Sequence, residues 1–387
     1  MKRPYNSSRW RSVLPWLRTG IVFALLITLV ETFLVFGIVT PVVIEGSSMA
    51  PALLGQHAEA TCPRCSWKFA IGGDQLPGDR PIVCPDCRES FWQEHPLVLQ
   101  PGRRLCVDRT RYAFRPPRRW EVVVFRCPER ASQLCVKRVL GLSGERLSFA
   151  AGDLLVDGHV IRKSIDEQLQ IRQLVHRERD LLRYWRAEDN SWQWGANAWQ
   201  HTGEAQTMLQ FQPVSGPVTD DLGINQRTTR PLHKATDLMV TCEASLTPGA
   251  RLEFRAIFPN QRRGKATSAT GYRTTIVWSL FDRQAMLAVD GKVVWTETTP
   301  AAWPDQPRLM ITATGEVTLH DLTVWRDAYY HTRPVDRHPA GHMSLAADEF
   351  FVVGDNVAIS DDSRSWSQPG LPERLIIGAP LVSGPSN

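Results

Sequence analysis

The sequence predicts a mainly β protein behind one N-terminal transmembrane helix, and three observations indicate this fold class. Residues 20–44, GIVFALLITLVETFLVFGIVTPVVI, form an apolar stretch whose one charged residue is Glu31. The rest of the chain contains short runs rich in β-branched residues and separated by turn residues, which is typical of antiparallel sheets. Two C-x-x-C pairs stand between the apolar stretch and most of these runs.

Composition and charge limit the class of protein. The chain has 387 residues, of which 43% are apolar and 22% are charged, and this indicates more than one globular domain. The net charge of +5 arises in segment 1–18, which holds five basic residues and no acidic one, because the other basic residues equal the 40 acidic ones in number. No net basic field is left to attract a phosphate backbone, so no nucleic acid is expected as a partner.

The apolar stretch is expected to be a retained membrane anchor over residues 19–44. Its length exceeds the roughly 20 residues that cross a bilayer, whereas a cleaved signal peptide has an apolar region of about 7 to 15 residues. The basic tail 1–18 would lie in the cytoplasm and the rest of the chain outside, facing the periplasm if the membrane is a bacterial inner membrane. Glu31 is costly in lipid and would either face a partner helix or be protonated.

Several β runs lie outside the cysteine-rich segment. They include EVVVF at 121–125, CVKRVLGL at 135–142 and LLVDGHVI at 154–161. Asp157-Gly158 predicts a type I′ hairpin turn, since both residues tolerate positive φ. A further run at 343–356 ends in an Asp-Asn turn, and residues 165–185 are the one helical candidate besides the anchor, although their leucines hold no clean helical period.

The two C-x-x-C pairs predict a zinc-ribbon-like insert over residues 57–98. Cys62 with Cys65 and Cys84 with Cys87 have the spacing of a four-thiolate site. A segment of about 40 residues needs such a support because its own core is small. Disulfides remain the alternative, because the expected topology places the segment in an oxidising compartment.

The other four cysteines are less informative. Cys127 and Cys135 flank PERASQL between two β runs, and the sequence leaves open whether they form a hairpin disulfide. Cys106 and Cys242 have no evident partner.

Residues 164–342 predict a second insert, an antiparallel β-sandwich. At least five β runs occur there, with a turn at Asp290-Gly291. The run LHDLTVWRDAYY at 319–330 resembles the last strand of a concanavalin-like or laminin-G-like jelly roll. Four tryptophans indicate either core packing or a platform for a carbohydrate or peptide ligand: Trp185, Trp192, Trp194 and Trp199.

A serine pair follows the apolar stretch, in EGSSMAPALLG at 45–55, and a reactive serine needs a base. The ten histidines show no Ser-His-Asp spacing. A lysine can act as the base if burial removes its charge. Lys137 fits this requirement, because it lies between apolar neighbours in a β run.

These residues resemble the ordered motifs of the type I signal peptidases, which are membrane-anchored Ser/Lys endopeptidases. The motifs are EGSSMAPALL, GRRLCVDR at 102–109, RRWEVVVFRCPE with CVKRVLGLSGE, and GDNVAISDDSR at 354–364. They imply a signal-peptidase-type β catalytic core made of residues 45–56, 99–163 and 343–387. The two inserts would interrupt this core.

The resemblance implies a role for each matching residue. Ser48 is the nucleophile, Lys137 is the general base, and no cofactor is needed for catalysis. Gly46 stands where many members carry a hydroxyl, and Ser360 supplies the hydroxyl that orients the lysine. The other supporting residues are Met49, Asp355, Asn356, Asp362 and Arg364. The candidate lining of the substrate pocket consists of Ile44, Leu53 and Val136.

The implied activity is cleavage of N-terminal signal peptides from exported preproteins, after small residues and through an acyl-enzyme. Two alternatives come from other classes. One is a self-cleaving Ser/Lys protease of the repressor type, which normally lacks the anchor and the last motif. The other is a membrane-anchored ligand-binding protein built around the β-sandwich.

Overall fold

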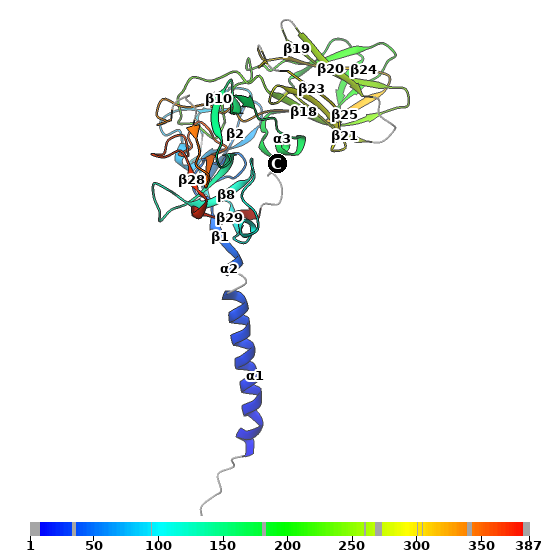
Figure 1. Ribbon diagram of the computed structural model, residues 1–387. Coiled ribbons are helices and arrows are strands. Elements are labelled where there is room, and N and C mark those ends of the chain that lie inside the picture. The colour runs from blue at the N-terminus through cyan, green and yellow to red at the C-terminus, as the bar shows by residue number, and fades with distance from the viewer. Residues whose placement is uncertain are drawn as a thin grey trace, which may run out of the picture.

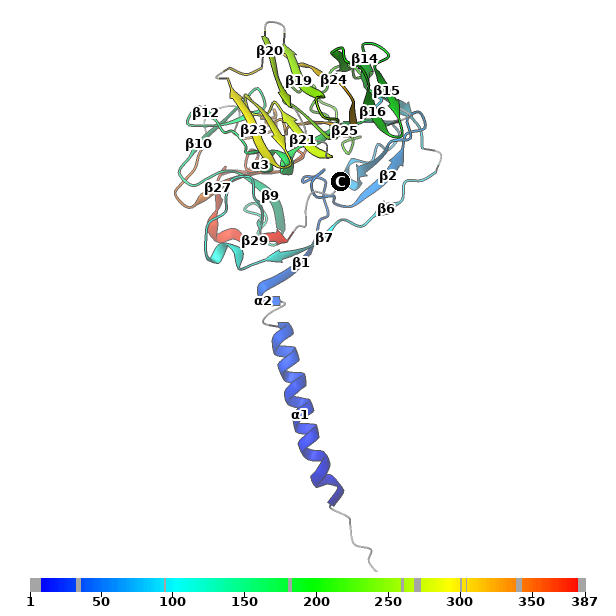
Figure 2. The same cartoon turned by 90° about the vertical axis from the view of Figure 1, so that its right-hand side faces the viewer.

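The computed structural model describes residues 8–32, 36–93, 95–179, 183–258, 261–267, 273–299, 301–303, 305–338 and 343–381. Most of its regular structure is strand, so the predicted mainly β class is confirmed. Figure 1 shows helix α1 (Ser8–Val30) extending away from a body of sheets. The sheets that contain β18 (Leu238–Leu246) and β19 (Arg251–Phe258) lie on the side of the body away from α1 (Figures 1 and 2).

The predicted anchor, residues 19–44, does not form one continuous helix. Helix α1 begins earlier, at Ser8, and the chain beyond it forms helix α2 (Phe36–Ile38) and strand β1 (Val39–Val43). Residues 33–35 lie outside the described part. β1 is rich in β-branched residues and pairs with the core sheet, where its place at the edge tolerates Pro41, which has no N–H to donate. Among the described residues, no helix is both long enough and apolar enough to cross a membrane.

One antiparallel sheet joins strands from two of the segments that were expected to form the catalytic core, 99–163 and 343–387, with β1 from the predicted anchor. Its strand order is β1-β7-β29-β8-β9-β27-β28. The shared sheet brings residues near 40, 137 and 353 of the sequence side by side. Besides β1, its strands are β7 (Arg104–Asp108), β8 (Val122–Arg126), β9 (Leu134–Gly141), β27 (Glu349–Val353), β28 (Leu371–Pro372) and β29 (Ile376–Leu381).

A smaller sheet packs beside the core sheet through an apolar cluster that includes Leu147, Leu154 and Phe351. Its order is β12-β11-β10-β26. The hairpin between β11 and β12 turns at Asp157-Gly158 as predicted, with φ values of 49° and 81°. The strands are β10 (Arg146–Ala150), β11 (Asp153–Val156), β12 (His159–Val160) and β26 (Met343–Ser344).

The helix predicted over residues 165–185 is confirmed only at its start. Helix α3 (Ile165–Ile171) begins with a capping box between Ser164 and Glu167. The chain then forms strand β13 (Gln173–Arg177), which pairs with β25 (Val317–Arg326). Residues 180–182 lie outside the described part. Without a 3.6-residue apolar period there is no continuous face to keep the segment helical.

The cysteine-rich segment forms two short antiparallel units. β2 (His57–Thr61) lies between β3 (Lys68–Gly72) and β6 (Leu99–Gln100), and β4 (Ile82–Val83) pairs with β5 (Ser90–Phe91). One C-x-x-C pair lies in the turn between β2 and β3, and the other lies between β4 and β5.

Two further sheets share one apolar core within residues 164–342. One has the order β15-β16-β25-β18-β21-β22-β23, with β13 also on β25, and the other has the order β14-β17-β24-β19-β20. Val240 and Leu319 of the first sheet belong to the same buried cluster as Leu252 and Ile311 of the second, which is the arrangement of a sandwich. The strands not yet bounded are β14 (Trp185–Ala187), β15 (Trp192–Gly195), β16 (Ala198–His201), β17 (Thr207–Phe211), β20 (Gln261–Thr267), β21 (Thr274–Ser279), β22 (Gln284–Val289), β23 (Lys292–Thr298) and β24 (Arg308–Thr314).

The tryptophans considered as a ligand platform belong to this core. Trp185, Trp192 and Trp199 are buried in it, and Trp194 packs against it while partly buried. The platform reading is therefore wrong, because an indole ring that faces inward offers little surface to a ligand.

Candidate active site

Ser48 and Lys137 lie in hydrogen-bond contact. The Lys137 Nζ and Ser48 Oγ atoms are 2.7 Å apart. Strand β9 carries Lys137, and Ser48 lies in the loop that follows β1. The Lys137 side chain is buried and Ser48 is half-buried. The core sheet therefore brings together two residues that are far apart in the sequence and that the resemblance singles out.

The surroundings of Lys137 disfavour its charged form. Burial lowers the pKa of Lys137 below the ordinary value of 10.5, while the Asp362 carboxylate opposes this shift. Asp362 forms its ion pair with Arg364 instead, because the Arg364 guanidinium donates to both of its carboxylate oxygens. The neutral form of the Lys137 amine is thus more favoured than it is for a lysine in water.

The loop after β27 holds the serine segment from the other side. The Asn356 backbone N–H donates to the Ser48 carbonyl at 3.0 Å, and Asn356 Nδ2 donates to the Ser47 carbonyl at 3.1 Å. The preceding Asp355 accepts two hydrogen bonds from Arg138, each 2.7 Å long. Arg138 is the immediate neighbour of Lys137 on β9. The same strand therefore places the lysine amine against Ser48 and forms an ion pair with the loop after β27.

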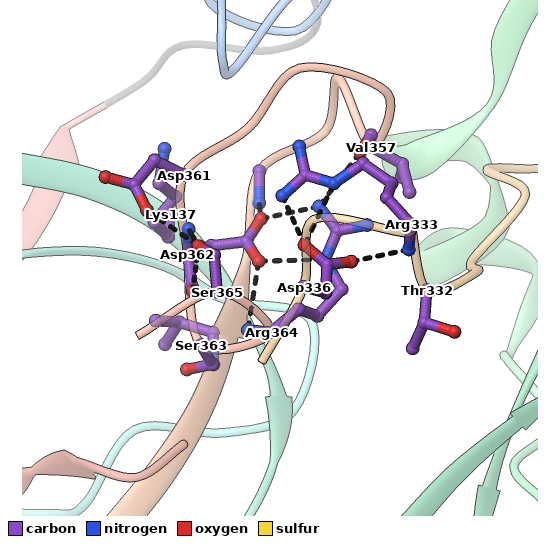
Figure 3. Close-up of polar contacts among 12 residues, drawn as sticks. Lys137, Thr332, Arg333, Asp336, Val357, Asp361, Asp362, Ser363, Arg364 and Ser365 are labelled. Atoms are coloured by element: carbon purple, nitrogen blue, oxygen red, sulfur yellow. Dashed lines mark hydrogen bonds and ion pairs between the residues drawn. The ribbon is translucent and has the colours of Figure 1, made fainter. Parts of the chain in front are cut away.

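Asp362 and Arg364 form the buried pair that the resemblance implies. Arg364 Nε lies 2.8 Å from Asp362 Oδ1, both side chains are fully buried, and the guanidinium holds the pKa of Asp362 below its usual value despite burial. Arg364 also donates to the carbonyls of His331 and Val357. Figure 3 shows this pair beside Lys137 and beside a second ion pair, Arg333–Asp336.

Ser360 differs from the expected arrangement. Its Oγ is buried and forms no hydrogen bond to Lys137 among the described residues. A contact with the Asp362 carboxylate, outside the geometry of a well-formed hydrogen bond, still helps to lower the pKa of Asp362. It lies close to Gly354, where any side chain would collide with both Ser360 and the Ser48 carbonyl. The hydroxyl is near the site, but the orienting contact with the lysine is not formed.

Apolar residues beside Ser48 form one cluster. Ile44, Met49 and Leu53 are buried in it together with Leu105, and the half-buried Val136 packs against them. The three candidate pocket residues are thus brought together with Met49. Gly46 is exposed and has open space where a side chain would stand.

The four cysteines of the C-x-x-C pairs converge. Their Sγ atoms all lie within 4.8 Å of one another, with 3.5 Å between Cys62 and Cys87 and 3.7 Å between Cys65 and Cys84. Zn–S bonds of about 2.3 Å in a tetrahedron put sulfurs about 3.8 Å apart, so the buried set fits a zinc ion. All eight cysteines of the chain are free thiols, including Cys127 and Cys135.

Sequence reasoning missed the polar contacts that the inserts make. His176 lies between Asp86 and Glu178, at 3.0 Å from each, and ties the second cysteine turn to the sandwich. Asp74 accepts a hydrogen bond from Ser47, and Asn225 pairs with Asn356, which holds the serine segment. No sequence signal marks these residues, because most of their partners lie between 27 and 131 positions away, many in irregular loops.

A cleft of about 1010 Å³ opens where the core, the cysteine-rich segment and the sandwich meet. Leu53, Trp67, Gln173 and Trp325 are among its lining residues. Ser48 and Lys137 do not line it, so the cleft lies beside the candidate active site, next to its apolar cluster.

Comparisons with known protein sequences agree with part of this picture. The family model described as "Signal peptidase, peptidase S26" matches residues 96–218, a segment that contains Lys137 and not Ser48. A Signal peptidase I from Leptolyngbya laminosa is 33% identical over 74 residues, which are 17% of this chain and 36% of that protein. The chain thus covers little more than a third of this relative's length. The two matches support a relationship to the type I signal peptidases.

Comparison with solved structures assigns neither a fold nor a ligand to this chain. The carbohydrate-binding module CBM66 from Bacillus subtilis gives a TM-score of 0.26 at 5% identity, over 36% of this chain and 94% of that one. A PL7 alginate lyase from Zobellia galactanivorans gives 0.24 at 8% identity, over 49% and 97% of the respective chains. TM-scores this low carry no conclusion about fold or ligand.

Proposed function

We propose that this protein is a signal peptidase that cleaves N-terminal signal peptides from exported preproteins, with Ser48 as the nucleophile and Lys137 as the general base. The observation that carries the proposal is the 2.7 Å contact between the Ser48 hydroxyl and a buried lysine whose pKa is lowered. The match to the signal peptidase family supports the substrate class. The catalytic core would consist of residues 45–56, 99–163 and 343–387, with segments 57–98 and 164–342 inserted.

The proposed chemistry is acyl transfer. Neutral Lys137 takes the proton of Ser48 as Oγ bonds to the scissile carbonyl carbon, and the carbonyl electrons move onto the oxygen. The Ser48 backbone N–H would stabilise this oxyanion, a contribution of about 3 kcal/mol per donor. Protonated Lys137 then gives its proton to the leaving amine as the C–N bond breaks. Water, deprotonated by Lys137, hydrolyses the resulting ester.

Recognition would rest on a strand-like substrate with small side chains. A signal peptide in extended form places alternate side chains against the enzyme. Ile44, Leu53 and Val136 would line the shallow apolar pockets for those side chains, and their shared cluster beside Ser48 supports this role.

Association with a lipid membrane is part of the proposal. The side chains of α1 from Trp16 to Val30 include many large apolar ones that are exposed, among them Phe23 at 66% and Leu25 at 64%. A helix that exposes apolar groups on all sides is unfavourable in water and favourable against lipid. Membrane association would bring Ser48 near the surface where a preprotein emerges.

The cleavage test uses the full chain in detergent or liposomes and a preprotein with an Ala-x-Ala site. We expect the wild type to release the mature protein at that site and Ser48→Ala to release none. Ser143→Ala, at an exposed serine of the core, serves as the control and should retain cleavage. Equal cutting by wild type and Ser48→Ala contradicts the assignment.

We also propose a structural zinc ion at Cys62, Cys65, Cys84 and Cys87. The two turns make the same backbone hydrogen bonds, from Ser66 N to the Cys62 carbonyl and from Arg88 N to the Cys84 carbonyl, which supports a paired metal site. Metal analysis of protein purified without chelator should find about one zinc per chain. Cys84→Ser should lose it, and Cys242→Ser, which changes a buried cysteine in the sandwich, should keep it. Absence of metal from the wild type sinks the zinc proposal.

A further inference from the structure

The serine segment is held by residues from outside the catalytic core. Ser47, the residue before the nucleophile, is only 1% exposed. Its hydroxyl donates to Asp74 Oδ1, and its backbone N–H donates to Asp74 Oδ2 at 3.5 Å. Asp74 belongs to the cysteine-rich segment, in the turn Gly73–Gln75 that follows β3.

The end of β3 lies directly against the same serine. Gly72 is needed there, because a Cβ at this position would collide with the Ser47 side chain. The Gly72 N–H donates to the Ile224 carbonyl at 3.2 Å. The sandwich insert therefore contacts the cysteine-rich segment at the point where that segment meets the serine loop.

The sandwich insert makes its own contact through Asn225. The side-chain amides of Asn225 and Asn356 donate to each other, at 2.8 Å and 2.7 Å. Asn356 in turn holds the carbonyls of Ser47 and Ser48. Asn356 is fully buried and Asn225 is 9% exposed, so water competes little for these hydrogen bonds.

We propose that Asn225 and Asp74 are positioning residues for the nucleophile, one from each insert. The inference rests on the proposed function and deepens it, because it gives each insert a part in the reaction. Neither residue has a hydrogen bond to Ser48 Oγ or Lys137 Nζ in the described part of the chain, so both act through Ser47 and Asn356. Asn225 fixes the amide plane of Asn356, and Asp74 fixes the rotation of Ser47.

Loss of either contact frees the serine loop without touching the reacting atoms. Misplacement of a nucleophile by about 1 Å costs on the order of 100-fold in rate. The candidate pocket residues beside Ser48 are apolar and make no side-chain hydrogen bond to Asn225 or Asp74, so substrate affinity should change little. A positioning role thus predicts a fall in kcat with KM preserved, whereas a general loss of stability predicts less active protein with unchanged kinetics per folded molecule.

The test compares Asn225→Ala and Asp74→Ala with matched controls at exposed positions of the same inserts, Asn190→Ala and Asp79→Ala. Cleavage of the Ala-x-Ala preprotein should show kcat lowered about 10-fold in the two test variants, with KM within about twofold. Asp74→Asn should retain most activity, because its amide oxygen still accepts from the Ser47 hydroxyl. Asp74 is itself exposed, so its replacement should be tolerated even if Asn225→Ala folds poorly.

A second measurement does not depend on activity. The Asn356 backbone N–H, which donates to Ser48, should exchange with solvent about 10-fold faster in Asn225→Ala than in Asn190→Ala. Unchanged kcat in both test variants, with unchanged exchange, overturns the inference while leaving the proposed function intact. If the wild type does not cut the preprotein, the proposed function fails, and the exchange rate alone decides whether Asn225 positions the loop.

Discussion

Lys137 and Lys163 are buried to nearly the same degree, yet their surroundings move the two pKa values in opposite directions. Lys163 is 2% exposed and forms ion pairs with Asp282 and with Asp327, the latter at 2.8 Å. These carboxylates raise the pKa of Lys163 well above its ordinary value despite burial. Lys137 is 4% exposed and has the Ser48 hydroxyl as its hydrogen-bond partner, and burial lowers its pKa.

The difference teaches that the partner, rather than burial, decides which form a buried amine takes. Asp362 is the acid with the largest electrostatic effect on Lys137, but its two oxygens are already bound by Arg364. The buried Arg364 therefore keeps Lys137 from forming an ion pair of its own. Lys137 is left with an amine that can act as a base, whereas Lys163, at the end of core segment 99–163, is bound to Asp282 and Asp327 of the sandwich insert.

Replacing each lysine by methionine should separate these roles, and the largest effect is expected at Lys137. Lys137→Met removes the base and should lower kcat for preprotein cleavage by at least about 1000-fold, within the range that general base catalysis contributes. The measured quantity is kcat per molecule of folded enzyme, with folding checked by circular dichroism. Activity within tenfold of the wild type contradicts a basic role for this amine.

Lys163→Met should act on stability instead. The substitution leaves Asp282 and Asp327 buried without their cation, which costs about 3–5 kcal/mol in the free energy of unfolding. Denaturant unfolding measures this loss, and kcat of the folded variant should stay close to that of the wild type. Lys137→Met, by contrast, removes an amine that is costly to charge and should leave the free energy of unfolding unchanged or raised.

The pH dependence of cleavage should follow Lys137. Since only the neutral amine accepts a proton, kcat/KM should rise with pH, with a midpoint below the ordinary lysine value of 10.5. The same shift makes the unfolded state bind more protons, so stability should rise with pH between the folded and unfolded pKa values of Lys137. Lys163 has a raised pKa and should contribute no change over this range. A rate that falls as pH rises through the neutral range is the opposite of what a lysine base gives.

The smallest effect is expected at Ser360, whose buried hydroxyl makes no well-formed hydrogen bond in the described part of the chain. Ser360→Ala removes an unsatisfied polar group, so the free energy of unfolding should be unchanged or raised by about 1 kcal/mol. If the hydroxyl turns to Lys137 when substrate is bound, kcat should still fall about 10-fold. Thermal unfolding and kcat, measured on one preparation, distinguish these outcomes. A destabilised variant would mean that the hydroxyl has a partner in solution.

The sequence predicted the parts of the fold that have local signals. Asp157-Gly158 and Asp290-Gly291 form the expected turns because both positions require positive φ. The strands around Lys137 and Phe351 were expected from their apolar runs and lie in the core sheet. The anchor boundary failed because β-branched residues after Gly37 suit an edge strand as well as an apolar helix, and pairing with β7 decides between them.

The candidate site was predicted only where residues carry motifs. The motifs of the resemblance pointed to two pairs of residues that the structure places in contact. These are Ser48 with Lys137 and Asp362 with Arg364. The contacts of Asn225 join residues 131 positions apart through two amides, and nothing local marks such a pair. For the tryptophans the sequence left core packing and a ligand platform open, since composition cannot tell an inward-facing ring from an exposed one, and the structure shows core packing.

The most direct test of the central claim is the pKa of the Lys137 amine itself, measured by NMR of side-chain-labelled lysine in the folded chain. We expect Lys137 to titrate below 10.5 and at the midpoint of the cleavage profile, with its signal identified by its loss in Lys137→Met. Lys163 should stay charged throughout the same titration. A Lys137 pKa at or above the ordinary lysine value would contradict the account, because the amine would then be charged where the enzyme must use it as a base.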